Sequence, residues 1–270
     1  MKVTFIGGGN MANALIGGLL NNGFPATEIV AVDPEAEKRD RLERVFGIRC
    51  FAASDAEALS CDAAVLAVKP QQMHDACLPL PPFLKQPLVI SIAAGLRLAD
   101  ISRWLGGYDR LVRAMPNTPA LIGAGVTGLY ALPGVSEAER LGAERIMHAV
   151  GSTLWVGDEA QIDALTAISG SGPAYVFLFI EALQQAAAEL GFSPRQVRQL
   201  SIETVLGAAK LVSLSEEPAS ALRERVTSKG GTTEAALRVM TKREFKEAVI
   251  LGIKAAKERG VEIGELLGKD

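Results

Sequence analysis

The chain has 270 residues, a formal net charge of -3, and 49% hydrophobic residues. This length suits two globular domains, and the charge provides no basic surface for nucleic acid, so we expect no nucleic-acid partner. The spacings of Cys50, Cys61 and Cys77 fit neither a metal site nor a disulfide framework. They predict unpaired thiols in a reducing cytoplasm and no bound metal.

The first half of the chain alternates short apolar strands with helical stretches. The predicted strands that open this series are Val3–Ile6, Ile29–Val32, Ala63–Val68, Leu88–Ile92 and Leu111–Ala114. Helices over Asn10–Leu20 and Pro34–Phe46 separate the first of them. This alternation is typical of βαβ units and predicts a Rossmann-type α/β domain with a parallel sheet. Strands at Val126–Leu129 and Thr153–Val156, with a helix over Ser136–Val150 between them, extend its far edge.

Beyond Gly157 the pattern predicts helices alone. They are expected over Ala174–Leu190, Pro194–Leu214, Thr232–Met240 and Lys242–Arg259. We therefore place a Rossmann-type domain at residues 1–157 and an all-α domain at residues 158–270. Tyr175–Ile180 is apolar all round, so this helix must be buried, either inside its own domain or against a partner subunit. No apolar run reaches the roughly 18 uninterrupted residues of a membrane span, so we expect no membrane partner.

A glycine turn joins the first strand to the first helix with the spacing G-x-G-x-x-A, formed by Gly7, Gly9 and Ala12. Gly7 permits the tight turn, Gly9 lets a pyrophosphate approach the backbone, and Ala12 keeps the helix close to the strand. The start of the helix then offers free N–H groups to phosphates. The alternative is a purely structural turn. The expected cofactor contacts here are Ile6, Gly7, Gly8, Gly9, Asn10 and Met11.

Asp33 ends the second strand, where an acid binds the ribose 2′-hydroxyl and selects NAD over NADP, or else caps the helix at Pro34. Lys38 and Arg39 follow and could reach a 2′-phosphate, so the cofactor is NADPH or NADH. Later strand ends face the same crevice. The cofactor contacts expected beyond the glycine turn are Asp33, Ser54, Ala67, Val68, Lys69, Pro70, Ala94, Gly95 and Asn117, with small residues leaving room for the nicotinamide ribose.

Val226–Glu234 precedes a predicted helix and contains two glycines and two threonines. Gly231 suits the N-cap, with Glu234 facing back as in a capping box. Backbone N–H groups at such a start bind a small carboxylate, although a plain capped loop has the same spacing. Ser169–Tyr175 is a second small-residue turn, suited to close approach of either a ligand or another helix.

These motifs, in this order and over essentially the whole chain, resemble the pyrroline-5-carboxylate reductase family. The resemblance implies hydride transfer from NAD(P)H to the imine carbon of 1-pyrroline-5-carboxylate, giving L-proline in the last step of proline biosynthesis. It also implies a cytoplasmic homodimer or higher homo-oligomer, held by the helical domain. The sequence departs from the family at Lys229, where proline is usual, and at Asp33, where a small polar residue is more frequent.

By the same resemblance, Ser228, Gly230, Gly231 and Thr232 grip the substrate carboxylate. Thr233 also binds the substrate, by a hydrogen bond to the ring nitrogen of the imine. It is the first of two predicted catalytic residues. Glu216, near the ring amine, is the second. Two alternatives stay open: a Rossmann-plus-helical dehydrogenase of the 3-hydroxyacid type, and a non-catalytic nucleotide sensor.

Overall fold

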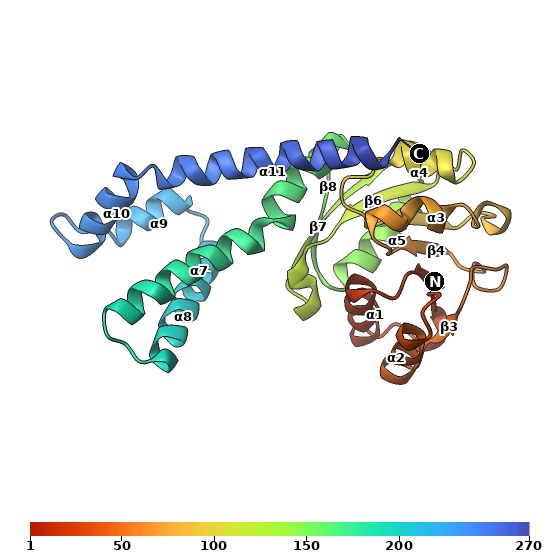
Figure 1. Cartoon of the computed structure of the whole chain (residues 1–270), viewed down its shortest axis with the longest axis horizontal. Helices are drawn as coiled ribbons and strands as arrows, with labels where there is room; N and C mark the ends of the chain where they lie inside the picture. The colour runs from red at the N-terminus through yellow and green to blue at the C-terminus, as the bar shows by residue number, and fades with distance from the viewer. Residues whose placement is uncertain (270) are drawn as a thin grey trace. The chain divides into compact units, whose positions relative to one another are not determined.

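The computed structural model describes residues 1–269, and Figure 1 labels most of its helices and several of its strands. The chain folds as two compact units. Unit 1 comprises Met1–Ser171 together with the chain from Ala256 onward, and unit 2 comprises Gly172–Ala255. This division falls later than our boundary at residue 157 and assigns the end of the last helix to unit 1. The domain limits 1–157 and 158–270 stay a prediction.

Unit 1 is built on an eight-stranded sheet with the order β3-β2-β1-β4-β5-β6-β7-β8. The strands are β1 Val3–Ile6, β2 Ile29–Val32, β3 Arg49–Phe51, β4 Ala63–Leu66, β5 Leu88–Ser91, β6 Leu111–Met115, β7 Gly125–Ala131 and β8 Gly151–Trp155. Because β1 pairs with β2 on one side and β4 on the other, the chain changes direction across the sheet at β1. This is the switch point at which open α/β sheets bind ligands, so the Rossmann-type prediction is confirmed.

The sheet is mostly parallel, but β7 runs antiparallel to β6. The two strands are joined by residues 116–124 alone, which contain the short 3-10 helix η4, Thr118–Ile122. A parallel crossover needs a dozen or more residues, usually including a helix, whereas an antiparallel return does not. The strand pattern in the sequence predicted neither this reversal nor the three-residue edge strand β3.

Helices cover both faces of the sheet. Those of unit 1 are α1 Asn10–Asn21, α2 Ala36–Phe46, α3 Met73–Cys77, α4 Leu98–Trp104, α5 Glu137–His148 and α6 Ala160–Leu165. Along β4, Ala63 and Val65 join one buried cluster while Ala64 and Leu66 join another, as the alternation of side chains across a strand requires. The first cluster includes side chains of α1 and α5, and the second those of α3 and α4.

Unit 2 is entirely helical, which confirms the predicted second architecture. Its helices are α7 Gly172–Glu189, α8 Pro194–Leu214, α9 Ala219–Arg225, α10 Thr232–Lys242 and the first part of α11 Phe245–Leu267. The short α9 was not predicted, and α11 continues beyond the expected end at Arg259. Glu244, with φ of 54°, makes the left-handed link between α10 and α11.

The apolar helix α7 has no buried residue within the chain. Val176, Phe177 and Leu178 are exposed by 44%, 58% and 67%. Burial inside its own domain is therefore wrong, and the partner-subunit interpretation remains.

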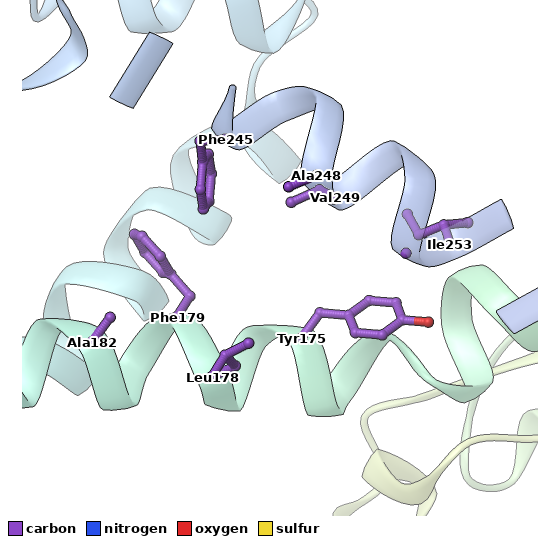
Figure 2. A pocket seen from close by; sticks show the side chains of 9 residues that line it. Tyr175, Leu178, Phe179, Ala182, Phe245, Ala248, Val249 and Ile253 are labelled. Carbon is purple, nitrogen blue, oxygen red and sulfur yellow. The ribbon is translucent and has the colours of Figure 1, made fainter. Parts of the chain in front are cut away.

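An apolar groove of about 440 Å³ runs along this helix, between α7 and the start of α11, and Figure 2 shows the side chains that line it. Phe179 and Phe245 approach each other across it with ring centroids 6.3 Å apart.

Candidate active site

The glycine turn lies at the carboxyl end of β1, and its backbone requires glycine at position 7. Gly7 has φ of 104°, and a Cβ there would lie 2.8 Å from the carbonyl oxygen of Ala67. A Cβ at Gly8 would lie 2.9 Å from Leu42 Cδ1. A side chain is therefore excluded at Gly7 by backbone, whereas at Gly8 it would require the Leu42 side chain to move.

Gly9 is different, because the protein itself leaves room beside it. The nearest heavy atom to a Cβ at Gly9 is the Ala67 carbonyl oxygen, at 4.0 Å. Gly9 is also the N-cap of α1, with no side chain capping the helix. The first-turn amides of Asn10 and Met11 therefore have no intrahelical acceptor, and unpaired amides at a helix start are the groups that bind phosphates in proteins.

Asn13 holds the turn from inside α1, a role that the sequence analysis missed. Its Nδ2 donates to the carbonyl oxygens of Gly8 at 2.9 Å and Gly9 at 2.8 Å. Asparagine on the helix that follows a glycine turn is the signal that could have revealed it.

Asp33 is buried and tethers the same turn. Its Oδ2 accepts from the Gly8 amide at 2.8 Å, and its Oδ1 accepts from the Glu35 amide at 2.9 Å. The N-cap of α2 is Glu35 rather than Asp33, so the simple helix-cap alternative is wrong. The carboxylate therefore lies against the glycine turn, where the 2′-phosphate of an NADP molecule bound at this turn would meet like charge.

The two cations near Asp33 already have partners. Lys38 Nζ donates to Glu35 Oε1 at 2.7 Å and lies 3.7 Å from Asp33 Oδ2. Its hydrogen bond to Glu35 raises the pKa of the Lys38 ammonium. Arg39 donates to the carbonyl oxygens of Asp33 and Pro34, both at 2.8 Å. Neither cation is held ready for a 2′-phosphate.

The other predicted cofactor residues of unit 1 gather at the neighbouring strand ends. The amide of Ala67 donates to the Ile6 carbonyl at 2.8 Å, and a Cβ at Gly7 would touch Val68. Lys69 is exposed, whereas Pro70, Ala94 and Ser54 are half-buried.

Gly95 and Asn117, both predicted cofactor contacts, also make structural contacts within unit 1. A Cβ on Gly264 of α11 would lie 2.3 Å from the Gly95 carbonyl oxygen, so close helix packing accounts for small residues at this crossing. Asn117 Oδ1 accepts from the Val126 amide at 2.9 Å, and its Nδ2 donates to the Ser169 carbonyl at 3.0 Å. Asn117 thus braces the π-helical turn Thr166–Gly170, a kind of turn frequent at functional sites.

A buried ion-pair network connects β6 to α6 and α4. Arg113 donates to Asp163 Oδ1 at 2.7 Å and to Glu159 Oε1 at 3.3 Å, and the Arg113 side chain is only 1% exposed. Arg97 contacts the second oxygen of Asp163 at 2.6 Å, and the Leu98 amide donates to Glu159 at 2.8 Å. Arginine in an otherwise apolar strand signals a buried acid, but its position could not be read from the sequence.

Neither of the strongly shifted thiols is a candidate nucleophile. Burial raises the pKa of Cys50 to about 11 and that of Cys77 to about 12, so both are protonated at neutral pH. Within residues 1–269, no group of three or more His, Cys, Asp or Glu residues is arranged to hold a metal ion.

The predicted substrate residues lie in unit 2, at the start of α10. Gly231 is the N-cap as predicted, and Gly230 has φ of 74°. Glu234 does face back, but its Oε2 accepts from the amide of Gly230 at 2.8 Å, one residue before the N-cap that a capping box uses. Ser228, whose carbonyl accepts from the Gly231 amide at 3.0 Å, closes the turn. The sites predicted at Ser228, Gly230, Gly231, Thr232 and Thr233 are therefore brought together.

Glu216 is not brought to this loop. It is exposed in the segment between α8 and α9. Within residues 1–269, no hydrogen bond or ion pair joins it to the start of α10.

A glycine turn at the switch point of a mostly parallel sheet, followed by an all-helical unit, is the architecture of a dinucleotide-binding protein. Residues 2–95 match the family model "NADP oxidoreductase coenzyme F420-dependent", and residues 159–263 match "Pyrroline-5-carboxylate reductase dimerisation". The chain belongs to the pyrroline-5-carboxylate reductase family.

Three relatives illustrate the family match. Pyrroline-5-carboxylate reductase of Pseudomonas aeruginosa is 47% identical over 99% of this chain and 98% of its own. The solved reductase of Coxiella burnetii is 43% identical, with a TM-score of 0.90 over 97% of each chain. The Plasmodium falciparum enzyme, solved with NADP bound, is 30% identical, with a TM-score of 0.87 over 98% of each chain.

The dimerisation match also accounts for an apolar helical run that the sequence analysis did not count. Ala160–Glu189 is long and apolar enough to cross a membrane by length and composition alone. The sequence predicted its second half as the helix Ala174–Leu190 and Ser169–Tyr175 as a turn, so the run was not considered as one apolar segment. Since the run lies in the dimerisation region, a second protein chain is the partner that its exposed apolar side chains imply.

Proposed function

We propose that this chain reduces 1-pyrroline-5-carboxylate to L-proline with NADPH or NADH. The observation that carries the proposal is the 47% identity to a pyrroline-5-carboxylate reductase along the whole chain. A bound nicotinamide would supply the hydride that reaches the imine carbon. We further propose a cytoplasmic homodimer or higher homo-oligomer. The three unpaired cysteines and the exposed apolar α7 support it.

In this proposal each unit has its own binding task. In unit 1, the residues from Ile6 to Met11 and the neighbouring strand ends would hold the dinucleotide. In unit 2, the turn from Ser228 to Thr233 would hold the substrate carboxylate, while the Thr233 hydroxyl would bond the ring nitrogen. Glu216 is kept as a proposed acid near the ring amine on the family resemblance alone. No residue need abstract a proton from carbon, because positioning of the imine and the nicotinamide is the main requirement.

The proposed reaction is tested by following oxidation of NADPH and of NADH at 340 nm. We expect oxidation that depends on 1-pyrroline-5-carboxylate, with L-proline as the product, and little with 3-keto acids. The second substrate class is the control for the 3-hydroxyacid alternative. Turnover of a keto acid without turnover of the imine would overturn the proposal, and binding of the dinucleotide without any turnover would favour the sensor alternative.

We also propose that Asp33 weakens the preference for NADPH. Its buried carboxylate is fixed against the glycine turn, and Lys38 and Arg39 are engaged elsewhere. Replacing Asp33 with Ser should therefore raise the NADPH-to-NADH ratio of kcat/KM by about fivefold or more, since one like charge near the 2′-phosphate is removed.

Asp40→Ser, an exposed position on α2, is the matched control and should leave this ratio unchanged. An equal loss of kcat/KM with both cofactors in Asp33→Ser would mean that Asp33 only holds the turn.

A further inference from the structure

At the start of α10, the carboxylate of Glu234 occupies the place where the proposed site would bind the carboxylate of the substrate. The Gly230 amide donates to Glu234 Oε2 at 2.8 Å, and the Gly231 amide donates to the Ser228 carbonyl at 3.0 Å. Both amides of the double glycine are thus engaged within the chain. The first-turn amides of Thr232 and Thr233 have no intrahelical acceptor, because a helix leaves its first N–H groups without one.

Glu234 occupies this place as a negative charge, not only as a hydrogen-bond acceptor. A carboxylate at a helix start is favoured by the helix dipole, and a substrate carboxylate would be favoured there for the same reason. Two carboxylates at the same amide repel each other. The Gly230 amide therefore becomes available to a ligand only when Glu234 moves away.

The structure provides a place for the displaced side chain. Glu234 is 41% exposed, so it can turn toward solvent without leaving a cavity. Arg238, one turn further along α10, lies 3.9 Å from the same carboxylate oxygen. This arginine can retain the charge of Glu234 when the contact with Gly230 is lost.

We propose that Glu234 is a built-in competitor for the substrate carboxylate, which holds the Gly230 amide until an anionic ligand displaces it. This inference rests on the proposed placement of the substrate at the Ser228–Thr233 turn. It makes Glu234 a specificity-determining residue, because an anionic ligand must displace it to gain the Gly230 amide, whereas a neutral ligand meets no like charge.

Steady-state kinetics of Glu234→Gln test the proposal. The KM for 1-pyrroline-5-carboxylate should fall about fivefold, which is the effect of removing one like charge a few ångströms away in a solvated site. Inhibition by L-proline should tighten by a similar factor, whereas inhibition by prolinamide, which carries no carboxylate, should not. Glu234→Ala, which removes both charge and contact, should lower the KM as well. Glu247→Gln, an acid in the first turn of α11, is the matched control and should leave the KM unchanged.

An unchanged or raised KM in both Glu234 variants would overturn the proposal, since Glu234 would then only shape the loop. The Thr233→Val variant separates this failure from a failure of the placement. If Thr233→Val slows the reaction while the Glu234 variants do not lower the KM, only the competitor role is wrong. If neither position affects the kinetics, the substrate does not bind at this turn.

Discussion

Replacing Asp163 with Asn is expected to lower the free energy of unfolding by about 3–5 kcal/mol, because a buried arginine loses the nearer and more deeply buried of its two carboxylate partners. The side chains of Arg113 and Asp163 are 1% and 3% exposed, so water cannot reach Arg113 to solvate its charge in place of the carboxylate. For a unit of this size the thermal midpoint should fall by on the order of 10 °C. Chemical denaturation and calorimetry measure the two quantities.

Glu57→Gln is the matched control for this loss. It also removes a carboxylate that pairs with arginine, but Glu57 and Arg49 are about 60% exposed. An exposed pair contributes at most about 1 kcal/mol, so this variant should be close to wild type. If Asp163→Asn is equally mild, the network does not hold β6, α6 and α4 together.

Thr233→Val should reduce kcat/KM for the imine by roughly 10- to 150-fold, the effect of losing one hydrogen bond to a charged group. Valine keeps the branched shape at the second residue of α10 and removes only the hydroxyl. If the hydroxyl acts mainly in the transition state, the loss appears in kcat more than in KM. The KM for the cofactor should stay unchanged, because the proposed dinucleotide residues belong to unit 1.

Thr241→Val, the same change near the other end of α10, controls for the substitution itself and should leave kcat/KM unchanged. A Thr233→Val enzyme within about twofold of wild type would show that Thr233 only begins the helix.

The parts of the molecule that the sequence predicts well are those fixed by local chemistry. The turn at Gly7 and the apolar strands β1, β2, β4 and β5 follow from spacing and hydrophobic runs of nearby residues. The edge strand β3 was missed because three residues with an exposed Arg49 carry no such run. The antiparallel β7 depends on the length of a loop rather than on strand composition.

The features that the sequence did not predict depend on contacts between residues far apart in the chain. Arg113 meets Asp163 across 50 positions of sequence, and no spacing rule links the two. Asp33 appeared to be either a ribose ligand or a helix cap, yet it bonds the Gly8 amide 25 residues away. At the α10 turn, the N-cap at Gly231 was predicted, while the one-residue difference in the contact of Glu234 required the three-dimensional structure.

Because the apolar face of α7 is exposed in the single chain, the stability of the protein depends on its concentration. A helix with no buried residue in its own chain gains that burial only by association, so its stability follows mass action. At low concentration a larger share of chains would carry bare phenylalanine and leucine side chains, which attract other unfolded proteins and proteases. The amount of protein that a cell makes is therefore itself a determinant of how much of it has this face covered.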